Sequence, residues 1–145
     1  SDALEFEPIH RVVFGVKPEK MIEELEKYYN ISREAGSGQK IVYVYKGKEE
    51  TIYITNPTSN LPVGSLQKFI DEYIKNYGGK VDYIHGDDVT RALGSEEGNI
   101  GFLLERMEKT DLFKTVILDG ALPRKTFSMG HSYDKRYYLE ARKIR

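Results

Sequence analysis

The sequence predicts an α+β domain in which helices pack on a mixed, mainly antiparallel sheet. Two observations favour this class. Segments rich in β-branched and aromatic residues alternate with amphipathic helical segments, and two neighbouring strands are joined by a tight turn. With 145 residues, of which 39% are hydrophobic, the chain suffices for one core of ordinary size. We therefore expect residues 1–145 to form a single α+β domain.

The chain begins with a predicted strand and an amphipathic helix. Residues 9–16 are rich in β-branched side chains and are followed by Lys17-Pro18, and proline suits the first turn of a helix. Between residues 18 and 29 apolar side chains recur at helical spacing, with glutamates on the other face. Apolar side chains show no periodic spacing in residues 32–39, and the segment contains two glycines, which predicts a loop.

A hairpin and a second helix follow. Residues 40–46 and 51–55 have the side-chain pattern of strands, and the residues between them include Gly47. Together the two segments predict a β-hairpin. Residues 63–77 carry apolar side chains on one helical face, and Gly78-Gly79 ends the helix.

The remaining elements continue the α+β pattern. Residues 80–85 predict a strand, and Asp87 is placed to cap a short helix. A strand at 99–105, a helix at 110–119, and closing strands at 125–129 and 136–144 complete the prediction. The order is β-α-β-β-α-β followed by α-β-α-β-β, and its first six elements match a ferredoxin-like core.

Composition excludes several classes of protein. The chain has no cysteine, so disulfide scaffolds, zinc-thiolate sites and cysteine nucleophiles are ruled out. No apolar run approaches the roughly 20 residues that cross a bilayer. Lys and Arg number 22 against 23 Asp and Glu, and the hairpin tyrosines alternate with valines as in a half-buried sheet. We expect a soluble cytoplasmic protein with neither a membrane nor a nucleic acid as partner.

The most unusual segment is the basic end of the chain. Residues 122–145 contain seven Lys and Arg against only Asp134 and Glu140. Arg124, Lys125, Thr126 and Ser128 bring together the cations and hydroxyls that recognise phosphate or carboxylate groups, without the spacing of a Walker loop. A solvated edge strand whose charges prevent aggregation is the alternative interpretation.

Two histidine segments are further candidates. His85-Gly86-Asp87-Asp88 has the groups of a metal or acid–base site, but a turn glycine and a capping aspartate explain the same residues, so we expect no metal. In the strand at 9–16, alternation points His10 one way and Arg11 the other. This pattern favours a hydrogen-bonded, partly buried His10, with an active-site role as the alternative.

Four segments carry a resemblance to a known family. They are residues 5–13, 83–87, 101–104 and 122–130, with Ile-His-Arg at 9–11 and Pro-Arg-Lys-Thr-Phe-Ser at 123–128. Together they resemble the C-terminal half of the bacterial and archaeal domain of unknown function 1015 family. Fuller members carry an A-D-G-H-H-R motif upstream, which looks like that of ParB-like and serine-kinase-like proteins and which this chain lacks.

The resemblance implies that this chain is the C-terminal half of a longer protein whose N-terminal half is catalytic and of the phosphotransfer type. Here Lys125 is followed directly by Thr126, without the extra serine of many members. We expect the domain to be inactive alone and to bind an anionic, phosphate-bearing ligand in a cleft shared with the N-terminal half. The expected anion-binding residues are His10, Arg11, Arg124, Lys125, Thr126 and Ser128.

The alternative is a structural or protein-interaction module without catalytic activity, which could assemble as a homo-oligomer through its hairpin or an edge strand. The substrate, the reaction and any cofactor stay open.

Overall fold

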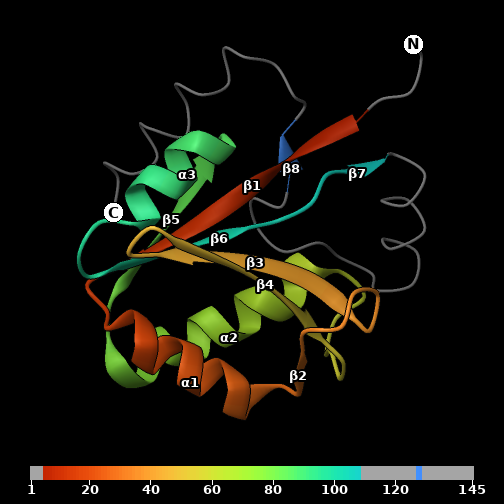
Figure 1. Ribbon diagram of the computed structural model, residues 1–145, viewed down its shortest axis with the longest axis horizontal. Coiled ribbons are helices and arrows are strands. Elements are labelled where there is room, and N and C mark those ends of the chain that lie inside the picture. The colour runs from red at the N-terminus through yellow and green to blue at the C-terminus, as the bar shows by residue number, and fades with distance from the viewer. Residues whose placement is uncertain (1–4, 109–126, 129–145) are drawn as a thin grey trace.

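The computed structural model describes residues 5–108 and 127–128, and Figure 1 shows a central sheet with α1 and α2 on one face and α3 on the other. The elements in chain order are β1 (Glu5–Phe14), α1 (Pro18–Tyr28), β2 (Ile31–Ser32), β3 (Gln39–Tyr45), β4 (Lys48–Ile54), α2 (Pro62–Tyr77), β5 (Lys80–His85), α3 (Asp87–Gly94), β6 (Asn99–Leu103), β7 (Met107–Glu108) and β8 (Phe127–Ser128). The α+β prediction is confirmed, with helices packed against an antiparallel sheet.

Most predicted elements up to residue 105 are present, while the predicted helix at 110–119 and strand at 136–144 lie outside the described residues. The two-residue strands β2 and β7 were not predicted. Asp87 was expected to cap α3, but Gly86 occupies the cap position with a φ of 108°, and Asp87 is the first helical residue. A positive φ favours glycine over residues with a side chain. The Asp87 side chain is therefore directed to other partners.

The sheet has the strand order β2-β4-β3-β6-β1-β5, with β7 and β8 pairing with β1. All pairings between the described strands are antiparallel, so the sheet is not mixed. A ferredoxin-like sheet would place β4 between β1 and β3. Here β6 occupies that position, and the ferredoxin-like expectation was wrong in this respect.

The composition of the two strands explains the difference. β6 is buried along its whole length, as a central strand must be. The first four residues of β4, which include Lys48, Glu49 and Glu50, are exposed. At the centre, α1 and α2 cover one face of the sheet and α3 covers the other, so those charges would be removed from water there without partners. The chain therefore keeps β4 toward the edge and fills the centre with β6.

The main hydrophobic core lies between the sheet and the two helices α1 and α2. Each helix presents an apolar face to the sheet, as its spacing predicts. The buried side chains come from both layers and include Met21, Leu25, Leu66, Phe69 and Ile70 from the helices, and Ile41, Ile52, Ile100 and Phe102 from the sheet.

On the opposite face, α3 lies close to β6. A Cβ atom at Gly94 would be only 2.6 Å from the backbone nitrogen of Gly101, so this contact between helix and strand requires glycine. The short helix covers one part of this face, and the polar residues beyond its amino end line a cavity. None of the helices within residues 5–108 combines the length and apolar character needed to cross a membrane.

Candidate functional site

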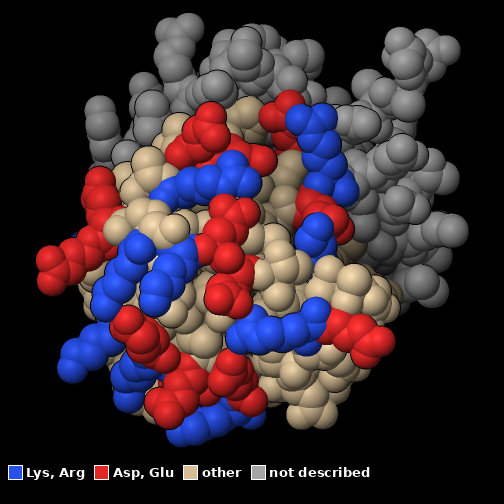
Figure 2. All heavy atoms as spheres, viewed as in Figure 1, with Lys and Arg blue, Asp and Glu red and all other residues tan. Residues whose placement is uncertain are grey.

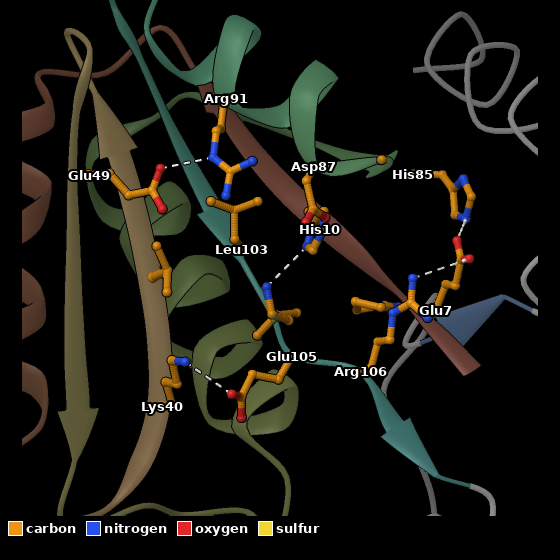
Figure 3. Close-up of a pocket in the computed structure, with 14 residues that line it drawn as sticks. Glu7, His10, Lys40, Glu49, His85, Asp87, Arg91, Leu103, Glu105 and Arg106 are labelled. Atoms are coloured by element: carbon orange, nitrogen blue, oxygen red, sulfur yellow. Dashed lines mark hydrogen bonds and ion pairs between the residues drawn. The ribbon is translucent and has the colours of Figure 1, made fainter. Parts of the chain in front are cut away.

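A cavity of about 510 Å³ opens on the face of the sheet that carries α3, next to the amino end of that helix (Figure 3). Pro8, Val42 and Leu103 contribute apolar surface from β1, β3 and β6. The charged and imidazole side chains around it come from separate parts of the chain and are Glu7, His10, Lys40, Glu49, His85, Asp87, Arg91, Glu105 and Arg106. This size is typical of a small-molecule site, and the lining is more highly charged than in most such sites.

His10 lies in the wall of the cavity and is held at both ring nitrogens. The backbone N–H of Leu104 donates to His10 Nδ1 at 3.0 Å, and His10 Nε2 lies 2.6 Å from Asp87 Oδ1. Because Nδ1 accepts a backbone hydrogen bond, the ring proton of the neutral histidine is assigned to Nε2, which donates to Asp87. His10 is only 1% exposed, and this burial lowers its pKa, with the Asp87 hydrogen bond opposing the shift.

These contacts define what His10 can do. With one nitrogen donating and the other accepting, the neutral ring has no lone pair available to take a proton from a ligand. The Asp87 side chain is 62% exposed, so the carboxylate that His10 fixes remains open to the cavity. His10 is thus a positioning residue, and Asp87 is the group that can contact a ligand.

We expect His10 to make stability depend on pH. Its lowered pKa means that the unfolded chain takes up a proton first, so stability is complete above about pH 6.5 and is lost as the pH falls toward the folded pKa. In His10→Gln the amide can keep both hydrogen bonds without titrating. Urea unfolding at pH 7.5 and 5.5 should give a smaller loss for this variant than for the wild type. Equal losses would contradict this role.

Two cation–carboxylate pairs lie across the cavity from His10, as Figure 3 shows. Lys40 Nζ donates to Glu105 Oε2 at 3.0 Å, and Arg91 Nε donates to Glu49 Oε1 at 2.9 Å. These hydrogen bonds raise the pKa of both cations, which therefore stay charged at neutral pH. All four side chains are more than a third exposed, so each pair contributes only about 0–1 kcal/mol.

A third charged group forms around Glu7. Its Oε1 lies 2.7 Å from His85 Nε2, and its Oε2 lies 3.7 Å from Arg106. Within the described residues, no three or more His, Asp and Glu side chains are arranged to hold a metal ion. The two candidate side chains of the His85-Gly86-Asp87 segment have different partners, because His85 turns to Glu7 and Asp87 to His10.

The structure separates His10 from Arg11, which the sequence placed in one anion site. Arg11 is fully buried on the face covered by α2, as the alternation along a strand requires. It donates to Gln67 Oε1 at 2.9 Å and to the carbonyl of Ile9 at 2.6 Å, and its guanidinium lies 4.8 Å from the ring centroid of Tyr83. Arg11 therefore does not line the cavity, and its grouping with His10 in a cleft was wrong.

The remaining predicted residues lie near or beyond the described part of the chain. Ser128 pairs with Glu7 in the register of β8 and β1, which brings its backbone beside a residue of the cavity. Arg124, Lys125 and Thr126 lie outside the described residues.

Sequence reasoning missed most of the charged residues around the cavity. One signal was present, since Asp87 and Arg91 are four positions apart on a helix and share a face. Alternation also places Lys40 on the same side of β3 as Val42. Nothing in the sequence indicated that β3 and α3 meet at one cavity.

Figure 2 shows one face of the molecule, where Lys and Arg alternate with Asp and Glu and the described residues form no extended patch of one sign. No family model, curated protein or solved structure matches this chain. The geometry of the cavity therefore carries the functional argument.

Proposed function

We propose that the cavity beside α3 binds a small anionic ligand that carries a phosphate group. In this proposal the chain is the C-terminal half of a longer cytoplasmic protein that resembles the domain of unknown function 1015 family. The cavity then forms one wall of a cleft shared with an N-terminal catalytic half of the phosphotransfer type, and the chain alone binds the ligand without turning it over.

The observation that supports the proposal is the meeting of three cations at one cavity, each beside a carboxylate. Lys40 comes from β3, Arg91 from α3 and Arg106 from the segment after β6. The amino end of α3, where the helix dipole favours negative charge, already carries Asp87 and Asp88 in its first turn, so the phosphate is assigned to the cations of the cavity.

A phosphate can compete with the carboxylates that now hold these cations. The Lys40–Glu105 and Arg91–Glu49 contacts are partly exposed ion pairs, each of which contributes only about 0–1 kcal/mol, so little free energy is lost when either cation turns away. An arginine can in addition bind two phosphate oxygens at once, which its present contact with Glu49 does not use. Lys40 and Arg91 can therefore exchange Glu105 and Glu49 for a bound phosphate at little cost.

Arg124, Lys125, Thr126 and Ser128 remain part of the proposed site. The first three directly precede β8, and β8 pairs with β1 at Glu7 and Pro8, which both line the cavity. Arg11 is left out because it is buried on the opposite face of the sheet.

Neutralising the cavity cations should weaken phosphate binding. We expect Lys40→Gln and Arg91→Gln each to raise the Kd for inorganic phosphate about tenfold, because each removes one charge-assisted hydrogen bond. The measurement is a phosphate titration of the ¹⁵N-labelled 145-residue chain followed by NMR.

Matched controls are available outside the cavity. Lys46 is paired with Glu19 at 2.8 Å and Arg33 with Glu50 at 2.8 Å, both partly exposed as Lys40 and Arg91 are. Lys46→Gln and Arg33→Gln should leave the Kd unchanged. If cavity and control variants weaken phosphate binding equally, the effect comes from the net charge of the protein, and the proposed site is refuted.

The alternative functions have less support. Tyr43 is buried, which removes one of the hairpin tyrosines from any stacking surface for nucleic acid. For an interaction module, the exposed start of β4 is a poor docking edge, because its charged residues oppose pairing with another strand. We therefore keep ligand binding as the proposed function.

A further inference from the structure

We propose that the ligand of this cavity is a small organic phosphate monoester that also carries an ammonium group, with its phosphate at Lys40 and Arg91 and its ammonium at Asp87. This inference rests on the proposed phosphate site and adds the chemical class of the ligand.

The charge balance of the cavity argues for the ammonium group. Counting only Lys, Arg, Asp and Glu among the described residues, the lining holds three cations and four carboxylates, namely Lys40, Arg91 and Arg106 against Glu7, Glu49, Asp87 and Glu105. This described part of the lining is thus negative by one charge before any ligand enters. A bare phosphate dianion would increase that imbalance, whereas an ammonium group on the same ligand offsets part of it.

Asp87 is the carboxylate placed to receive that ammonium group. His10 holds its Oδ1 at 2.6 Å, which fixes the direction of the side chain, and the carboxylate is nonetheless largely exposed. The other three carboxylates of the cavity each lie within 4 Å of an Arg or Lys side chain, as the dashed lines in Figure 3 show. An ionised carboxylate only accepts hydrogen bonds, and an ammonium group supplies three donors.

The two proposed contacts lie on one face of α3. Asp87 and Arg91 are four residues apart on the helix, so they are neighbours on its surface with Cβ atoms roughly 5–6 Å apart. A ligand with an amine and a phosphate at the two ends of a short hydrocarbon chain can contact both side chains, whereas phosphate alone has no cationic group for Asp87.

The apolar part of the cavity provides a place for such a chain. Pro8, Val42 and Leu103 line the cavity from three strands of the sheet. The volume of about 510 Å³ is far larger than a phosphate ion needs and lies in the usual range for organic ligands. Methylene groups that cover these side chains gain by leaving water.

Three probes separate the contributions of phosphate, hydrocarbon and amine. Binding of inorganic phosphate, propyl phosphate and 3-aminopropyl phosphate to the 145-residue chain is measured by the same NMR titration. We expect propyl phosphate to bind about tenfold more tightly than phosphate, since its methylenes cover apolar surface. The aminopropyl ester should bind about fivefold more tightly again through the partly exposed ion pair with Asp87.

Two variants test the assigned contacts. Asp87→Asn can still accept the His10 hydrogen bond but carries no charge, so it should abolish the preference for the amine. Asp88→Asn removes a charge from the neighbouring residue, which is fully exposed, does not line the cavity and lies 3.6 Å from Arg91 Nη1. This variant should affect the binding of both esters alike through Arg91 and should preserve the preference for the amine. Val42→Thr should reduce the gain from the propyl group, while Val81→Thr, outside the cavity, should not.

The outcomes distinguish this inference from the function on which it rests. If none of the three probes binds, the phosphate site itself is refuted. If all three bind equally, or the two esters bind equally, the phosphate site stands and the aminophosphate ligand is overturned. An equal loss of amine preference in Asp87→Asn and Asp88→Asn also overturns it, because the effect would then come from net charge alone.

Discussion

Arg11→Ala is expected to destabilise the domain by about 2–5 kcal/mol, a large fraction of the total stability of a small protein. Arg11 is 0% exposed, and its guanidinium donates to Gln67 and Ile9 while lying over Tyr83. The substitution leaves a cavity between β1 and α2 and removes donors from two buried oxygens. Urea unfolding measures the loss, and a change below about 1 kcal/mol would contradict this account.

Arg11→Met tests whether Arg11 contributes to packing or to ligand binding. Arg11→Met fills most of the volume, so it should cost less than Arg11→Ala. Because Arg11 lies on the α2 face, the folded Met variant should bind phosphate as the wild type does. A folded Arg11→Met protein that had lost phosphate binding would return Arg11 to the anion site that the sequence suggested.

Gly94→Ala is expected to destabilise the protein by about 1–3 kcal/mol, although alanine is the better helix former by about 1 kcal/mol. The new Cβ would lie 2.6 Å from the nitrogen of Gly101, 2.9 Å from its Cα and 3.1 Å from the carbonyl oxygen of Val44. All three are backbone atoms and cannot rotate away. The helix must therefore move away from β6. The packing that is lost costs more free energy than the higher helix propensity of alanine contributes.

The consequences of Gly94→Ala should extend to the cavity. α3 carries Asp87 and Arg91, so its displacement loosens the Asp87–His10 hydrogen bond and weakens phosphate binding. Gly36→Ala is the control, since its Cβ would meet nothing within 4 Å and only its positive φ is strained. That variant should lose stability without a change in the phosphate Kd. A Gly94→Ala protein as stable as the wild type would refute the close contact.

Much of the secondary structure followed from local patterns. The apolar spacing in the residues of α2 and the glycines after it predicted a helix that ends at Tyr77. The alternation in β1 predicted that His10 and Arg11 point to opposite faces, which their contacts now show. Such patterns are readable because one periodic segment buries one face, whatever that face contacts.

The candidate site was predicted only in part. His10 was named and lines the cavity, whereas Lys40 and Arg91 were not, and Arg11 was named but lies elsewhere. The sequence suggested a role for His10 but not its partners, because Asp87 and Leu104 lie 77 and 94 positions away in the chain.

The sequence by itself determined the fold class, the longer helices and strands up to residue 105, and the opposite faces on which His10 and Arg11 lie. Only the tertiary structure decided that β6 separates β1 from β3, and this one placement brings the N–H of Leu104 to His10 and Glu105 to Lys40. The physical reason is the range of the interactions. The periodic pattern of a segment shows which of its faces is buried, and it can be read from that segment alone. Strand order depends instead on which segments can be buried on both faces at the centre of the sheet. All strands of the chain compete for those central positions, so the order cannot be read from any one of them.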